Sequence, residues 1–478
     1  MIKFILIALF LSIWHSILFF HHEMGLSVVL FVLPLLLFII YVLKKEDKIE
    51  NKYGLLLSIP IILLSCTYFV YDNWFFRTFN LVIIPLLFFL MYIITMKKKY
   101  FLLDLVRDSF SFVLMPVTSM FEITEIIGDS LFKKVKLSEC LKSKIKSFLI
   151  ILPIVLVVLW LLASADMIFS GIFDYLFDGM SLFLVDFLSE DFIRRIILIA
   201  VIFFVISGTV YYLVNDYLKF TRLDVDDFRK EKKQKNVDAI KMLFIILNII
   251  YVVFDFIQIK SLMFHSVSSD IHYAEYARQG FFQLMIVSVI NLTLILISKK
   301  YMLVSDKEQS RFFKIMSFIM IGLTIVIIIS SFLRMNLYEQ QYGYTLLRLL
   351  VYVSLITEIM LMIPTIIYIV KDNYNIIISY MVIILIVYIG LNYMNVDKII
   401  AVRNIDRYYD KEDIDLDYLE NENVDNLGVL VDFYKEVKDE EIKERLGIYF
   451  KYLDIEMDNW QEYNISKDKG RELLRGYR

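Results

Sequence analysis

Residues 345–370 read TLLRLLVYVSLITEIMLMIPTIIYIV, and only Arg348 and Glu358 interrupt this apolar run with a charge. A helix needs about 20 mainly apolar residues to cross the hydrocarbon core of a bilayer. The apolar residues are continuous rather than alternating with polar ones, which argues against the strands of a membrane barrel. This stretch therefore predicts a transmembrane helix.

Similar apolar runs recur along the first 393 residues. In lipid each backbone segment must satisfy its own hydrogen bonds, which favours helices. We therefore predict an all-α fold, a polytopic membrane bundle in residues 1–393, followed by a small C-terminal helical extramembrane domain in residues 394–478. The bundle would have about eleven spans, at residues 3–20, 25–43, 53–71, 79–95, 147–164, 196–214, 241–258, 280–298, 312–332, 345–370 and 375–393.

The composition supports a membrane protein and excludes several other classes. The chain has 478 residues, of which 59% are hydrophobic, and a mean hydropathy of +0.65. Soluble domains are nearer 45–50% apolar, and two cysteines cannot build a disulfide framework. Nucleotide-binding, zinc-protease and serine-hydrolase motifs are absent from the sequence. We therefore expect a non-enzymatic protein with no catalytic residues and no cofactor.

The distribution of lysine and arginine predicts the orientation in the cell membrane. Basic residues are frequent in loops 44–52, 96–146, 215–240 and 299–311 and scarce in the intervening loops. Cytoplasmic loops carry the excess of positive charge. The N-terminus is therefore predicted to be cytoplasmic and the C-terminal tail extracytoplasmic.

Two long loops have an amphipathic composition. Residues 100–125 mix phenylalanine and leucine with charged residues and are flanked by lysines, which is typical of a helix lying on the inner leaflet. These lysines either anchor the topology or recognise anionic lipid. Residues 165–193 are an acidic amphipathic segment on the predicted outer side, which is either a solvated loop or attracts cations. Membrane lipid is thus an expected partner, and nucleic acid is not.

Polar side chains inside the predicted spans are the first candidates for a functional site. Glu358, Ser354, Asn248 and Asn291 lie near the middle of their spans. Such residues are costly in lipid and often functional. A cluster of the four would either bind a proton, an ion or a polar substrate, or hold helices together by hydrogen bonds.

Asp255 and Arg348 are candidates for an ion pair on two different spans, about one turn inside the outer boundary. Such a pair would be structural or would act as a gate.

Four histidines fall in predicted outer loops and are weak candidates for a metal site. They are His21, His22, His265 and His272. Their spacing matches no zinc motif, so we predict no metal site.

The tail from residue 394 has a different composition, with 22 acidic against 14 basic residues. Its apolar residues recur at helical spacing, and Ser466 is a candidate cap for a last short helix.

Two tail segments carry a family resemblance. Residues 396–419 contain RNIDRY and DLDYL, and NWQEYNIS lies at 459–466. Together with the layout of spans, they resemble an uncharacterised family of bacterial multi-pass membrane proteins known only as a domain of unknown function. The resemblance implies a helical membrane fold and brings no activity, substrate or catalytic residue.

Two functions remain open from the sequence. The first is a non-enzymatic sensing, regulatory or assembly protein of the cell envelope, with residues 394–478 binding a protein or envelope partner. The second is a secondary transporter, or an ion- or proton-coupled permease, that uses the polar cluster around Glu358.

Overall fold

The structure is a computed structural model of the whole chain. It describes residues 1–96, 122–124, 126–127, 190–215, 237–263, 281–302, 307–371, 374–421 and 423–477. Outside these residues lie the predicted span 147–164, nearly all of the two amphipathic loop segments 100–125 and 165–193, and His265 and His272.

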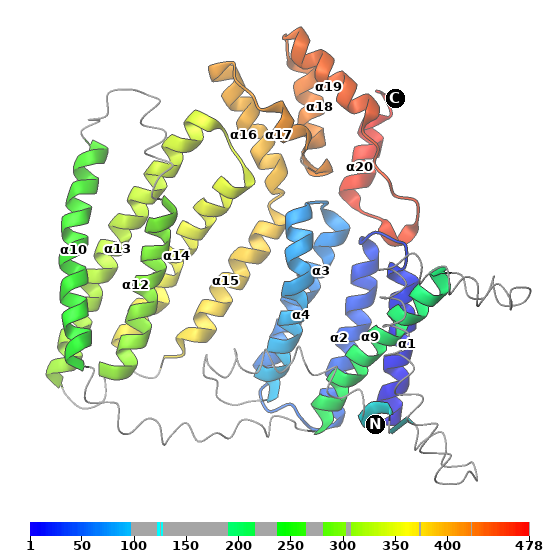
Figure 1. Cartoon of the computed structure of the whole chain (residues 1–478), viewed down its shortest axis with the longest axis horizontal. Coiled ribbons are helices and arrows are strands. Elements are labelled where there is room, and N and C mark those ends of the chain that lie inside the picture. The colour runs from blue at the N-terminus through cyan, green and yellow to red at the C-terminus, as the bar shows by residue number, and fades with distance from the viewer. Residues whose placement is uncertain are drawn as a thin grey trace, which may run out of the picture. The chain divides into compact units, whose positions relative to one another are not determined.

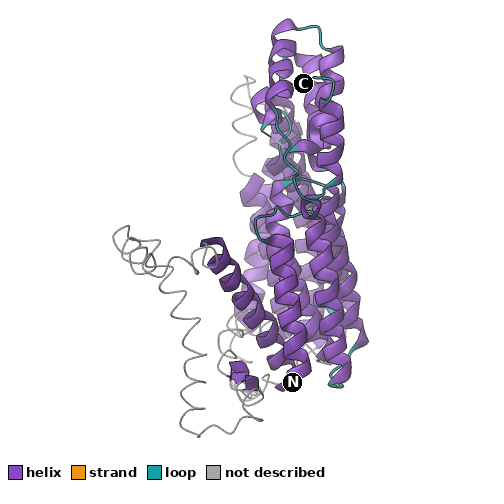
Figure 2. Cartoon of the chain, turned by 90° about the vertical axis from the view of Figure 1, so that its right-hand side faces the viewer, coloured by secondary structure: helices purple, strands orange, loops and turns teal. Residues whose placement is uncertain are grey.

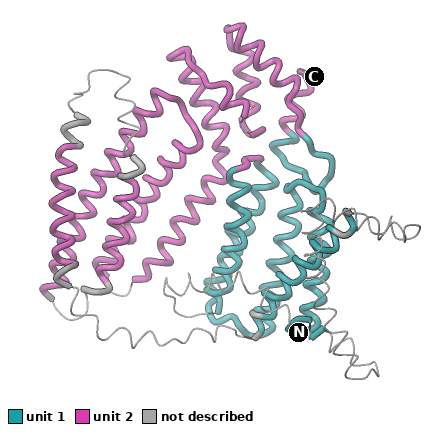
Figure 3. The backbone as a smooth tube through the Cα atoms, in the orientation of Figure 1, with its two compact units in different colours: residues 1–71, 75–221, 456–468 teal, residues 72–74, 222–455, 469–478 magenta. Residues whose placement is uncertain are grey.

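The chain forms two compact units (Figure 3). Unit 1 consists of residues 1–71, 75–221 and 456–468, and unit 2 of residues 72–74, 222–455 and 469–478. The domain boundary predicted at residue 394 follows composition, whereas the units follow packing, so that boundary stays a prediction.

In unit 1, long apolar helices pack side by side (Figure 1). α1 contacts α9 and α2, and α2 contacts α3. A short 3-10 turn, η1, leads into α3. The bounds are α1 Ile2–Phe19, α2 Leu26–Lys45, η1 Lys52–Leu57, α3 Ser58–Val70, α4 Trp74–Met96 and α9 Glu190–Asn215.

In unit 2, α13 is the central helix of a bundle, because α10, α12 and α14 all pack against it. α15 packs against α14. Phe244, Phe313, Met320 and Leu355 are among the buried residues of the shared apolar core. The bounds are α10 Val237–Met263, α12 Phe281–Met302, α13 Lys307–Tyr342, α14 Leu346–Val370 and α15 Ile376–Tyr393.

Nine helices in the described part of the chain are long and apolar enough to cross a membrane. α12 is a further apolar helix, with a shorter stretch at Leu284–Lys299. The described residues contain no strand (Figure 2). The protein is therefore an all-α, multi-pass membrane protein, which confirms the predicted fold class.

α13 is longer than predicted. The sequence indicated a span at 312–332 followed by a loop, but the helix continues to Tyr342 and has 36 residues. At 1.5 Å per residue it is about 54 Å long, well beyond a hydrocarbon core of about 30 Å. Residues 333–342 contain neither glycine nor proline, so nothing stops the helix before Gly343. Gly343 has a φ of +80°, the left-handed conformation that commonly terminates helices.

The C-terminal residues are also helical. α18 packs against both α16 and α19, and the buried apolar residues of α18 and α19 include Leu430, Phe433, Leu446 and Phe450. The ring of Phe450 lies 5.2 Å from that of Tyr477 and anchors the chain end within unit 2. The bounds are α16 Val396–Lys411, α17 Leu416–Glu420, η4 Val424–Asn426, α18 Leu427–Glu436, α19 Glu440–Tyr452, η5 Trp460–Glu462 and α20 Ile465–Leu474.

Candidate functional site

Glu358 lies inside the unit 2 bundle and is only 5% exposed. Its carboxyl group shares a hydrogen bond with the hydroxyl of Ser288, which is completely buried. The bond joins α14 to α12. The sequence did not identify Ser288, although its position three residues before Asn291 places both on one face of a helix.

Asn291 is the centre of a second set of buried hydrogen bonds. The Tyr251 hydroxyl donates to Asn291 Oδ1 at 2.7 Å, and Asn291 Nδ2 donates to Thr324 Oγ1 at 3.0 Å. These bonds connect α10, α12 and α13. Tyr251 and Thr324 are ordinary residues of their spans in sequence, and only the packing makes them partners of Asn291.

Asn248 and Ser354, the other two members of the predicted cluster, donate hydrogen bonds to backbone oxygens. Asn248 donates to the backbone oxygen of Met316 at 3.2 Å, and Ser354 donates to that of Val351 at 2.8 Å. Thus none of the four predicted residues is hydrogen-bonded to another. They belong to one bundle, but their partners come from residues that the sequence did not single out.

The predicted ion pair between Asp255 and Arg348 is not formed. Arg348 donates to the backbone oxygens of Tyr342 and Gly343 and lies over the ring of Tyr338 at 4.4 Å. The end of α13 offers carbonyl groups without helical partners, and Arg348, in the first turn of α14, reaches them directly. Asp255 is 4% exposed, and neither of its carboxyl oxygens has a hydrogen-bond partner in the described structure.

Lys299 and Glu339 are two buried charged residues that lie in helices, although the sequence predicted loops at both positions. Lys299 donates to the backbone oxygens of Tyr368 and Lys371 at the end of α14. Glu339 accepts a hydrogen bond from the Tyr352 hydroxyl at 2.8 Å. Glu339 lies in the extension of α13 and is buried there. Because the sequence predicted a loop at this position, it did not predict that Glu339 is buried.

The RNIDRY motif binds the turn between α13 and α14. Asn404 Nδ2 donates to the backbone oxygen of Tyr344 at 2.9 Å, and the Tyr344 amide donates back to Asn404 Oδ1 at 2.8 Å. Arg407 donates to the backbone oxygen of Gln341 at 2.8 Å. From the DLDYL motif, the Tyr418 hydroxyl accepts from the Leu346 amide at 2.9 Å. The motif thus satisfies backbone groups that the helix ends leave unpaired.

Asp397 fixes a second turn within unit 2. It accepts hydrogen bonds from Asn73 Nδ2 at 2.7 Å and from Asn423 Nδ2 at 2.8 Å. Burial raises the pKa of Asp397, and the bonds from the two asparagines oppose that rise. The amide of Asp72 also donates to Asp425, so tail residues satisfy the 72–74 turn.

The segment 459–464, from the second motif, forms hydrogen bonds with backbone groups at the ends of three helices of unit 1. Gln461 donates to the backbone oxygen of Ile17 at 3.4 Å, near the end of α1. The amide of Leu26, the first residue of α2, donates to the backbone oxygen of Tyr463 at 3.0 Å. Asn464 donates to two backbone oxygens near the end of α3, those of Tyr68 at 2.9 Å and Tyr71 at 2.8 Å.

Asn464 also caps α20, because its Oδ1 accepts from the Lys467 amide at 3.0 Å. Ser466, the cap predicted from the sequence, is instead the second residue of the helix. Asn464 occupies the position directly before the first helical residue, where a side-chain oxygen reaches the free amides of the first turn.

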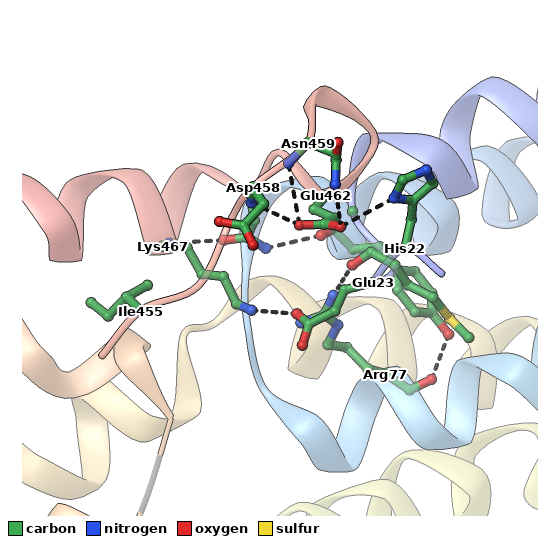
Figure 4. A network of polar contacts seen from close by, with 12 residues as sticks. His22, Glu23, Arg77, Ile455, Asp458, Asn459, Glu462 and Lys467 are labelled. Atoms are coloured by element: carbon green, nitrogen blue, oxygen red, sulfur yellow. Dashed lines mark hydrogen bonds and ion pairs between the residues drawn. The ribbon is translucent and has the colours of Figure 1, made fainter. Parts of the chain in front are cut away.

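A polar network surrounds Glu462 (Figure 4). Its carboxylate accepts from the Asp458 amide at 2.9 Å, and His22 Nδ1 lies 3.3 Å away. Partial burial tends to raise the pKa of Glu462, but these hydrogen bonds and those from Asn459 hold it below its ordinary value. Lys467 forms an ion pair with Glu23 at 2.6 Å, which adds a second link to the loop between α1 and α2.

The same network borders a hollow of about 350 Å³. No group of three or more histidine, cysteine or acidic residues in the described structure is arranged to hold a metal ion. His21 instead lies 3.3 Å from Asp191. The lining residues are Phe19, His21, His22, Glu23, Glu456, Asp458, Asn459 and Glu462.

A second hollow, of about 280 Å³, lies on the tail within unit 2. Arg445 on its wall donates to Glu420 at 2.7 and 2.9 Å and to Asp417 at 2.6 Å. These bonds raise the pKa of Arg445 still further, so it is permanently charged. The other lining residues are acidic, aliphatic or, in one case, aromatic. They are Tyr408, Glu412, Asp413, Ile414, Asp415, Leu416, Asp417, Asp439 and Ile442.

A family model described as "Domain of unknown function (DUF4153)" matches residues 58–433, well over half of the chain. The chain belongs to this family. The resemblance drawn from the tail motifs and spans is thereby confirmed. The RNIDRY and DLDYL motifs of this DUF4153 member lie inside the matched range, and the segment 459–464 lies beyond it. Comparisons with curated proteins and with solved structures found no match.

Proposed function

We propose that this DUF4153 protein is a non-enzymatic assembly protein of the cell envelope. Its membrane helices hold the C-terminal helical residues in place, and those residues bind a partner. The observation that carries the proposal is the use of both tail motifs as attachments to helix ends. Asn404 and Asn464 each make two such bonds, to Tyr344 and to the end of α3.

These attachments account for the polar motif residues without invoking catalysis. A buried amide that makes several hydrogen bonds holds a segment in one position. A membrane protein that only needed to anchor a flexible tail would not require them. The arrangement supports a role in which the position of the tail matters, as it does when a partner must be assembled at the membrane.

The exposed side of the tail has the composition of a binding surface. Tyr409 is 56% and Tyr452 74% exposed. Exposed aromatic residues are common anchors at protein interfaces. Acidic residues outnumber basic ones in this part of the chain, so the partner that suits it is a basic protein segment.

Site-specific photo-crosslinking in intact cells tests this function. A photo-reactive residue replaces Tyr409 or Tyr452, and the control replaces Ile386, which is exposed on the apolar helix α15. We expect a discrete protein adduct from the two tail positions and not from Ile386. Adding Asn404→Ala should weaken the adduct from Tyr409, because it loosens the attachment of α16 to Tyr344. The absence of a protein adduct from both tail positions would contradict the proposal.

Transport coupled to Glu358 is a second candidate, favoured by the burial of that carboxyl group at the contact of α12 with α14. Liposomes containing the whole protein and a pH-sensitive dye test it under an imposed proton gradient. A gradient that collapses with the natural chain and the Ser354→Ala control, but persists with Glu358→Gln, would establish transport. A gradient that persists with all three removes this candidate.

A further inference from the structure

The hydrogen bond between Ser288 and Glu358 raises the question of which group supplies the proton. Ser288 Oγ contacts the Glu358 carboxyl group and also lies 2.7 Å from the backbone oxygen of Met285. A serine hydroxyl has one proton to donate, and a backbone oxygen can only accept. Both contacts are hydrogen bonds at once if Ser288 donates to Met285 and Glu358 donates to Ser288.

Thr324 on α13 has the same two kinds of partner as Ser288, a backbone oxygen of its own helix and a polar side chain of a neighbouring helix. It lies 2.7 Å from the backbone oxygen of Met320 and accepts from Asn291 Nδ2 at 3.0 Å. The hydroxyl proton of Thr324 is therefore used within its own helix, and the partner across the interface supplies the other proton. By this comparison Glu358 occupies the position of the donor, as the amide of Asn291 does.

The apolar stretches of the bundle helices around Glu358 contain no basic residue, and the buried basic residue nearest to them on α13 is Arg334, directly after residue 333. Residues 242–259, 281–298, 315–333, 349–370 and 376–393 contain no lysine or arginine. On α14, Arg348 is ten residues away, about 15 Å along the axis, and binds the end of α13. On α12, Lys299 is about 16 Å from Ser288 and binds the end of α14.

The other titratable groups of these stretches are tyrosines and one acid, and neither kind carries a positive charge that could neutralise a carboxylate. The Tyr251 hydroxyl already donates to Asn291. Asp255 is a second buried acid, with no hydrogen-bond partner in the described structure. An ionised carboxylate buried without a cation is very unfavourable, and such a group takes up a proton instead.

We infer that Glu358 is a proton-binding site, a neutral carboxylic acid at neutral pH whose hydroxyl donates to Ser288 Oγ. The ligand is a proton, and the bond that holds it links α14 to α12. The inference stands independently of the assembly function and of transport, because it concerns the charge state of one group in the resting protein.

Infrared difference spectroscopy of the full chain in lipid nanodiscs tests the inference. The spectrum of the natural protein at neutral pH minus that of Glu358→Gln should contain the carbonyl stretch of a protonated carboxyl group, shifted downward in heavy water. Asp255→Asn serves as the matched variant and identifies the contribution of the other buried acid. A difference spectrum that contains the bands of an ionised carboxylate instead overturns the inference.

Ser288→Ala provides an independent test that keeps the acid in place. Removing the acceptor should shift the protonated carbonyl band of Glu358 without abolishing it, since the proton belongs to the acid. A carboxyl band that stays unchanged in Ser288→Ala contradicts the assigned bond. A band that disappears when choline is replaced by sodium in the buffer shows that the site holds a metal cation, and it also overturns the proton assignment.

Discussion

At the residue scale, asparagines and a glutamate carry the attachment of the C-terminal residues to the membrane helices. Asn464 has no special position in the hydrophobic pattern, yet it is completely buried and serves two backbone oxygens and one amide. Asparagine suits this position because it has both an acceptor oxygen and a donor nitrogen. A motif of polar residues in a tail therefore has a structural role that composition does not reveal.

Replacing Asn464 by alanine should lower the stability of the protein. The substitution removes three hydrogen bonds of a completely buried side chain, which costs about 2–4 kcal/mol. The thermal midpoint in detergent should fall by several degrees. Asn421→Ala is the matched control, because Asn421 is exposed and its side chain makes one bond within its own segment. Equal midpoints for the two variants would contradict the assigned role.

The carboxylate of Glu462 should make the attachment of segment 459–464 sensitive to acid. Because the folded state lowers the pKa of Glu462 from its ordinary value of 4.5, its ionised form stabilises the fold above that pH. This contribution is lost as the pH falls below about 4.5 towards the folded pKa. Limited proteolysis at pH 7 and pH 4 should show faster cleavage of the segment in acid.

Glu462→Gln should reduce that difference between the two pH values, since glutamine does not titrate. The control Glu472→Gln changes an exposed residue of α20 and should retain the full difference. An acid effect of the same size in Glu462→Gln would show that another group is responsible.

At the element scale, helix ends decide which loops are structured. α13 continues past the predicted span because its sequence lacks a terminator before Gly343, whose left-handed φ ends it. The backbone groups left unpaired at this turn are taken up by α16, through Asn404. Hydropathy locates the apolar part of a helix, but the end of the helix depends on glycine and on the partners that its last carbonyl groups find.

Gly25→Ala should disturb the start of α2. A β-carbon at Gly25 would lie 2.5 Å from the backbone carbon and oxygen of Glu462, which are not free to move like the end of a side chain. We expect segment 459–464 to be displaced and cleaved at least several-fold faster by protease. Gly390→Ala is the control, since a β-carbon there meets nothing within 4 Å. Unchanged cleavage in Gly25→Ala would refute this close approach.

At the scale of the whole molecule, the structure places residues 456–468 beside the loop between α1 and α2, at the end of unit 1 opposite Met1. The attachments of segment 459–464 therefore put this part of the tail and the N-terminus at opposite ends of the unit 1 helices. The odd number of spans stays a prediction. Which end faces the cytoplasm rests on the lysine and arginine distribution.

Cysteine labelling in intact cells measures that orientation. In a chain carrying Cys66→Ser and Cys140→Ser, a cysteine replaces either Tyr452 in the tail or Lys3 near the N-terminus. A membrane-impermeant maleimide should label the first before lysis and the second only after lysis. The reverse result would place the tail in the cytoplasm. Labelling of both before lysis would contradict the opposite placement of the two ends.

The sequence by itself determined the class of fold, because uninterrupted apolar runs have only one stable conformation in lipid. It also predicted the approximate positions of the described apolar helices, the helical tail and the burial of Glu358. Only the tertiary structure decided the partners: Ser288 for Glu358, Tyr251 and Thr324 for Asn291, and the end of α13 rather than Asp255 for Arg348. The reason is physical, since hydropathy depends on single residues, whereas a hydrogen bond depends on the rotation and register of two helices.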